Sequence, residues 1–127
     1  MKTRPINAPD APPPGTSYAQ AMEVTGASRL LFISGQIPVD AADRLPADFG
    51  AQCRQAWANV EAQLRAAGMG LQNLVKVSTF LADRQYTEDN RAVRIEVLGE
   101  LQPALTVIIT GIYVKAWLVE IEAIAAA

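Results

Sequence analysis

The chain has 127 residues, enough for one domain with a single hydrophobic core. Its formal net charge of -2 and its pI near 5.0 argue against nucleic acid as the main partner, because binding a phosphate backbone needs a basic surface. The absence of histidine and the single cysteine exclude an intrachain disulfide, a thiolate metal cluster, and any nucleophilic or metal site that depends on histidine.

The N-terminal segment, residues 1–14, is rich in proline, which stands at positions 5, 9, 12, 13 and 14. Proline fixes φ and has no backbone N–H, so we expect an extended, irregular arm rather than a helix or a central strand. The segment lacks the apolar stretch of a secretory signal, and the apolar runs elsewhere are too short to cross a bilayer. We therefore expect a cytoplasmic protein with no membrane partner.

Two strands are expected next. Between residues 17 and 24 the side chains alternate with the period of a strand, with Tyr18, Gln20, Met22 and Val24 on one face. A turn cluster at 25–28 separates this segment from a more apolar strand at 29–36. Because strands joined by a short turn usually pair, we predict a β-hairpin here.

An amphipathic helix is expected after a polar loop at 40–47. Asp48 is a suitable N-cap, and Gly68 stands where helices commonly end. Between them, apolar residues recur at helical spacing on one face: Phe49, Cys53, Trp57, Val60, Leu64 and Ala67. This pattern predicts a buried, unreactive thiol for Cys53, and packing in the core or an interface for Trp57 and Trp117.

The second half of the chain continues with a strand at 74–82, which is rich in β-branched residues. Thr87 is expected to cap a second helix that runs to about Leu98, and Gly99 to end it. Two further strands are expected at 105–113 and 117–125.

The resulting order, β-β-α-β-α-β-β, predicts an α+β two-layer sandwich in one domain over residues 1–127. A mostly antiparallel sheet would carry two helices on one face and leave the other face uncovered. The strands hold too many apolar side chains for all of them to face the helices: Met22, Val107, Ile109, Leu118 and Ile124. An uncovered apolar face predicts self-association.

Five segments form a series along the chain: PGTSYAQA at 14–21, FISGQIP at 32–38, the helix at 52–68, the strand and turn at 74–83, and VEIEAIA at 119–125. In this order they resemble the RidA/YjgF family of imine and enamine deaminases, also labelled endoribonuclease L-PSP. The resemblance spans residues 13–126 and implies a chorismate-mutase-like homotrimer with a small-molecule cleft between subunits. The implied reaction is hydrolysis of a C=N bond with release of ammonia, without a cofactor or metal.

The resemblance also implies a site. Tyr18 is similar to a pocket tyrosine of the family, Gly35 to a glycine whose backbone lies close to the ligand, and Asn90 to an asparagine in the second helix. Val107 stands where a backbone N–H can serve a substrate oxygen. Glu120 matches the glutamate that orients the attacking water, which makes it the candidate base.

Tyr18 and Glu120 each have a structural alternative. Tyr18 is also suited to filling the core. Glu120 and Glu122 alternate with apolar residues and so point to one face of the sheet, where both are also suited to ion pairing at the surface or in an interface.

Leu105 departs from the family pattern. It lies in QPALTV at 102–107, which resembles a Pro-Ala-Arg-Ser signature whose arginine grips the substrate carboxylate, and an aliphatic side chain cannot make that contact. Only fourteen residues separate Asn90 from Leu105, a shorter connection than is usual in the family. Lys115, Arg91 and Arg94 are the candidates to replace the cation, but for each of them we favour a solvated, exposed side chain.

We therefore expect a hydrolytic deaminase of imines, enamines or related small metabolites, with a substrate preference altered by Leu105. The alternative is a non-catalytic trimer that binds a small molecule or a protein partner.

Overall fold

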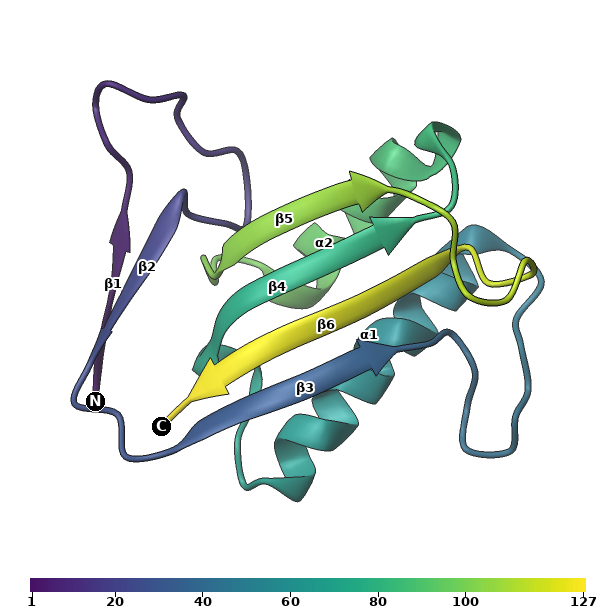
Figure 1. Ribbon diagram of the computed structural model, residues 1–127, viewed down its shortest axis with the longest axis horizontal. Coiled ribbons are helices and arrows are strands. Elements are labelled where there is room, and N and C mark those ends of the chain that lie inside the picture. Colours follow the sequence, from purple (N-terminus) through teal and green to yellow (C-terminus); the bar gives the residue numbers. More distant parts are fainter.

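The computed structural model describes residues 1–127 as two helices packed on one face of a four-stranded sheet (Figure 1). The strands stand in the order β3 (Leu30–Gln36), β6 (Val119–Ala126), β4 (Leu74–Leu81) and β5 (Ala104–Ile109). β4 and β5 are parallel, and the other neighbours are antiparallel. The predicted α+β two-layer sandwich is confirmed. The strand expected at 105–113 ends earlier, at Ile109, and residues 110–118 form a loop.

α1 (Phe49–Ala66) supplies the helical half of the core. Asp48 caps it as predicted, its carboxylate accepting a backbone N–H at 2.8 Å, and Gly68 follows its end with a φ of +70°. The predicted apolar face packs against the sheet and includes the fully buried Trp57 and Cys53. Burial raises the pKa of the Cys53 thiol to about 12, so the thiol stays protonated and unreactive.

A short 3₁₀ turn, Arg84–Tyr86, leads into α2 (Thr87–Leu98). The predicted cap at Thr87 is wrong by one residue, because Asp83 opens the turn and Thr87 becomes the first helical residue. The Thr87 hydroxyl instead donates back to the Arg84 carbonyl at 2.8 Å. Gly99 ends α2 as predicted, with a φ of +55°.

The predicted hairpin between residues 17–24 and 29–36 is wrong. β2 (Ala21–Thr25) pairs with β1 (Lys2–Ile6) in a separate two-stranded ribbon, and β3 pairs with β6 (Figure 1). Alternation identifies a strand but not its partner. The N-terminal arm was expected to be irregular throughout, yet its residues 2–6 form β1, because Pro5 is tolerated where both strands of a ribbon are edges.

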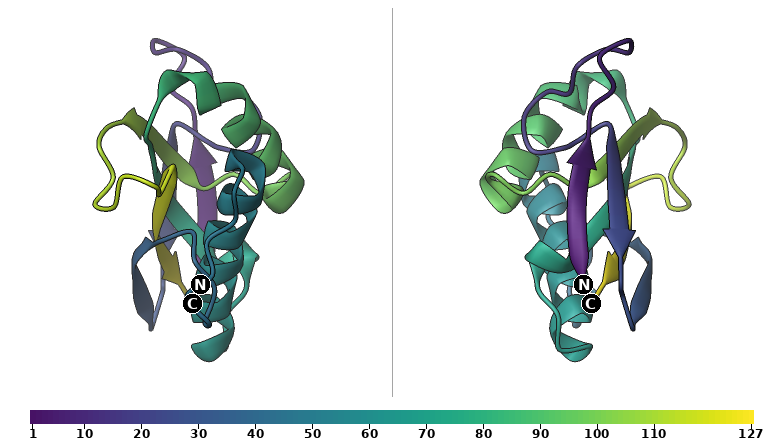
Figure 2. Two further views of the ribbon diagram at one scale, coloured as in Figure 1. Left: turned by 90° about the vertical axis from the view of Figure 1, so that its right-hand side faces the viewer. Right: turned by 90° about the vertical axis from the view of Figure 1, so that its left-hand side faces the viewer.

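No helix covers the second face of the sheet, since both helices lie on the same side of it (Figure 2). This open face carries the exposed apolar side chains of Leu30, Phe32 and Ile108, which are 60%, 71% and 46% exposed. Of the residues from which an apolar second face was predicted, only Ile124 lies here, paired with Phe32. The others lie elsewhere: Ile109 and Leu118 pack against the core, Val107 lines a pocket near α2, and Met22 belongs to the ribbon.

Candidate functional site

A pocket of about 620 Å³ lies between β5, α2 and the segment 15–20. Four of the six predicted site residues line it: Tyr18, Asn90, Leu105 and Val107. The other lining residues are mostly polar, namely Gly15, Thr16, Gln20, Thr87, Arg91 and Arg94. Residues that are far apart in the sequence therefore meet in one concave site.

Contacts with β5 and with the loop before it hold Tyr18 at the pocket. Ser17 has a φ of 63°, which is uncommon for a residue with a side chain, and its hydroxyl donates to a carbonyl just after α2. The Ala19 N–H donates to the Pro103 carbonyl at 3.2 Å, and Ala19 forms an isolated bridge with Ala104. Tyr18 between them is half-buried and stays outside the core cluster, so it lines the pocket rather than filling the core.

Asn90 lies on the inner face of α2 and is only 2% exposed. The Cys53 thiol donates to its Oδ1 across 3.8 Å, a contact that helps to orient the amide. The apolar face of α1 thus supports a polar pocket residue on α2. The amide N–H groups remain as donors for a ligand.

Arg94 is the pocket residue whose burial the sequence did not predict. It is 6% exposed, whereas we expected a solvated side chain. Its guanidinium carbon lies 5.7 Å from the centre of the Tyr18 ring. Burial, and the neighbouring charge of Arg91, lower the pKa of Arg94. Arg94 follows Asn90 by four positions on α2, so the two side chains share a helix face, and that spacing was the signal available in the sequence.

The other two candidate cations differ from Arg94. Arg91 lines the same pocket but is exposed. Lys115 is exposed in the loop 110–118 and is not among the residues that line this pocket.

Glu120 and Gly35 lie apart from this pocket. Glu120 alternates with the buried Val119 and Ile121, so it lies on the open face, where it lines a second concavity of about 590 Å³ beside the loop 110–118. Leu105 lies on the helix side of the sheet, in register with the buried Val77. One protomer therefore carries two separate parts of the predicted site.

Gly35 and Glu120 lie against each other within the second part. A Cβ on Gly35 would come within 2.8 Å of the Glu120 carboxyl carbon, so the glycine leaves room for the carboxylate in this position, and a larger residue would make Glu120 shift. Neither Glu120 nor Glu122 forms an ion pair within the chain, and both carboxylates face the open side of β6.

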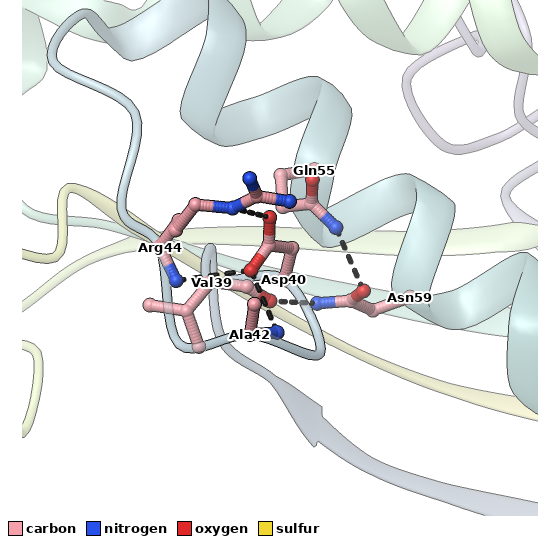
Figure 3. A network of polar contacts seen from close by, with 6 residues as sticks. All are labelled: Val39, Asp40, Ala42, Arg44, Gln55 and Asn59. Carbon is pink, nitrogen blue, oxygen red and sulfur yellow. Dashed lines mark hydrogen bonds and ion pairs between the residues drawn. The ribbon is translucent and has the colours of Figure 1, made fainter.

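A polar network holds the loop that follows β3 (Figure 3). The Asn59 amide nitrogen donates to the carbonyls of Ile37 and Val39 at 2.8 Å each. Asp40 accepts from the backbone and the side chain of Arg44 at 3.0 and 2.8 Å, and these hydrogen bonds lower the pKa of the Asp40 carboxyl. The network fixes the chain just beyond Gly35.

No group of three or more histidine, cysteine or acidic side chains is arranged to hold a metal ion. None of the helices combines the length and the apolar character needed to cross a membrane.

A family model described as Endoribonuclease L-PSP matches residues 8–127. This chain belongs to the RidA/YjgF family. A RutC family protein of Pyrococcus horikoshii is 37% identical over 118 residues, which cover 91% of each chain. The Rid family protein YyfB from Yersinia pestis, described as of unknown function, has a TM-score of 0.87 at 26% identity over the full length of both chains. The YjgF gene product of E. coli has a TM-score of 0.70 at 31% identity, and the match covers 97% of this RidA/YjgF chain and 98% of the E. coli chain.

Proposed function

We propose that this RidA/YjgF member is a homotrimer that hydrolyses the C=N bond of small imines, enamines or related metabolites. One observation carries the proposal. Tyr18, Asn90, Leu105 and Val107 meet in one pocket, as the family resemblance requires, although they come from three different parts of the chain.

The proposed reaction adds water to the imine carbon. The water oxygen forms a C–O bond, the C=N bond becomes a C–N single bond, and the product separates into a carbonyl compound and ammonia. Glu120 accepts a proton from the attacking water, which raises the nucleophilicity of the water, and then returns that proton to the nitrogen, so that ammonia leaves and the carboxylate is regenerated. Tyr18, Asn90 and the backbone N–H of Val107 supply hydrogen bonds that hold the substrate.

The reaction needs Glu120 and the Tyr18 pocket together, and they lie on different faces of one protomer. Assembly of three protomers through their open faces would bring the Glu120 of one subunit to the pocket of its neighbour. The exposed Phe32 and Leu30 favour this assembly, because a large apolar surface is stabilised when a second copy covers it.

Leu105 changes which substrates fit. Removing one partner of a charged contact in a pocket typically costs about 2–5 kcal/mol, equivalent to a roughly 30- to several-thousand-fold loss of affinity. A substrate that relies on a carboxylate contact at β5 is therefore held poorly. Preferred substrates are uncharged or are anchored by another part of the pocket.

A non-catalytic trimer that binds a small molecule is the second candidate function. The replacement at Leu105 favours it, because the substrate contact implied by the family is absent while the pocket remains. The two candidates differ in whether Glu120 is needed for turnover or only for structure.

Glu120→Gln separates the two candidates. Small imines are generated in solution, the one that wild type hydrolyses fastest over the uncatalysed rate is chosen, and the release of its carbonyl product is followed. The substitution keeps the size of the side chain but removes its basicity, so kcat should fall by about 10²–10⁴-fold with the trimer intact. Glu122→Gln, on the same face of β6, is the matched control and should lose little. Equal kcat values for wild type and Glu120→Gln would end the base assignment.

A further inference from the structure

Arg94 is a buried cation without a partner. It is 6% exposed, its Nε has no hydrogen-bond acceptor, and it takes part in no ion pair, whereas Arg4, Arg44, Arg54 and Arg65 all pair with carboxylates. An unsatisfied charged group away from water is costly. An acceptor that came from outside the chain would remove this cost.

The surroundings of Arg94 favour an anion as that acceptor. Arg94 lines the pocket of about 620 Å³, and Arg91, on the same helix, lines it as well. None of the lining residues is acidic, so within one protomer no carboxylate in the pocket neutralises the two cations. The Tyr18 ring lies next to the Arg94 guanidinium, at 5.7 Å, and limits the directions from which an anion can approach it.

The opposite wall of the pocket is apolar. Leu105 and Val107 line it from β5, and Val107 is 37% exposed, so its side chain is available for contact. A ligand that satisfies both walls has an anionic end and an apolar body. A guanidinium presents parallel N–H groups that match the two oxygens of a carboxylate.

We infer that this pocket binds a small carboxylate with an apolar body, and that Arg94 on α2 binds the carboxylate group. The inference rests on the proposed function only for the reaction that would follow binding. It places the anionic end of the ligand at Arg94 on α2 instead of at position 105 on β5. Leu105 then contacts the body of the ligand.

Titration calorimetry with benzoate tests the inference directly on the wild-type protein in its native oligomeric state. Benzamide, which has the same shape and no charge, should bind at least about tenfold more weakly, because hydrogen bonds to ions are stronger than neutral ones. Inorganic phosphate should also bind more weakly than benzoate, since it has no apolar body. Equal affinity for benzoate and benzamide, tighter binding of phosphate, or no benzoate binding would each overturn the inference.

Arg94→Met keeps a long side chain and removes the charge. Benzoate affinity should fall by at least about 30-fold, while the melting temperature stays the same or rises because an unpaired buried charge is gone. Arg94→Lys keeps the charge but loses the planar fork, and should bind about tenfold more weakly than wild type. Undiminished benzoate binding by either variant would contradict the role of Arg94.

Two further variants serve as comparisons. Arg91→Met should weaken benzoate binding less than Arg94→Met does, and this smaller effect should disappear at high salt because Arg91 is exposed. Arg84→Met, in the turn before α2 and outside the pocket, should bind benzoate as wild type does.

Binding and turnover separate this inference from the proposed function. Benzoate binding that depends on Arg94, with no hydrolysis of any imine tested, would leave the inference standing and remove the deaminase proposal. Imine hydrolysis that depends on Glu120, with no benzoate binding, would support the deaminase proposal and remove the inference about Arg94.

Discussion

Gly35→Ala should impair catalysis without unfolding the protein. The new Cβ would lie 2.8 Å from the carboxyl carbon of Glu120 and 3.1 Å from its Cγ, well inside the distance at which carbon atoms pack. The flexible end of Glu120 gives way, at a cost of about 0.5–1.5 kcal/mol for an unfavourable rotamer. A catalytic group displaced by roughly 1 Å loses up to about 10²-fold in rate.

The measurements for Gly35→Ala are kcat for imine hydrolysis and the melting temperature. Gly50→Ala, in the first turn of α1, is the control, because its Cβ would meet only the ends of two polar side chains, at 3.2 and 3.4 Å. That variant should keep wild-type kcat and be as stable or slightly more stable, since alanine favours the helix by up to about 1 kcal/mol. Wild-type kcat in Gly35→Ala would refute the argument that this glycine makes room for a catalytic carboxylate.

The remaining predictions concern assembly, specificity and pH. Light scattering should give a mass near three times 13.6 kDa, and a monomer would remove the intersubunit site. Leu105→Arg should increase kcat/KM for imines of small 2-amino acids over the wild-type value, and an unchanged value would show that position 105 does not set specificity. The raised pKa of Cys53 stabilises the fold below about pH 9, where unfolded thiols are also protonated, and this contribution falls as pH rises towards 12. Wild type should therefore lose about 1 kcal/mol more unfolding free energy than Cys53→Ala between about pH 9 and 10. Equal losses of unfolding free energy in the two proteins would contradict this prediction.

Local signals in the sequence predicted the helices well, because a cap or a stop depends on neighbouring residues. Asp48 and Gly68 bound α1 as expected, and only the start of α2 differs, where the turn begun by Asp83 takes over the role expected of Thr87. Strand pairing was not predictable in the same way. β2 pairs with β1 rather than with the neighbouring β3, and that choice depends on contacts between distant parts of the chain.

The candidate site was predicted only in part, because its residues come from distant parts of the chain. The resemblance brought Tyr18 and Leu105 into one pocket, which local patterns alone could not do. The burial of Arg94 was missed because a charged residue on a helix is usually solvated, and its burial here depends on residues distant in the sequence, such as Tyr18. Alternation along β6 put Glu120 on the face away from its buried neighbours, but the position of Leu105 on the helix side depends on the register of β5 with β4, which the sequence did not define.

Mixed oligomers test the central claim most directly. Glu120→Gln removes the base, and Val107→Trp blocks the pocket, so each variant alone should be inactive. If a cleft combines the Glu120 of one protomer with the pocket of its neighbour, a random equal mixture restores about a quarter of the clefts. The account predicts that the two variants, coproduced and purified as mixed trimers, recover about a quarter of the wild-type imine hydrolysis rate. Activity no higher than that of either parent would contradict a site shared between subunits.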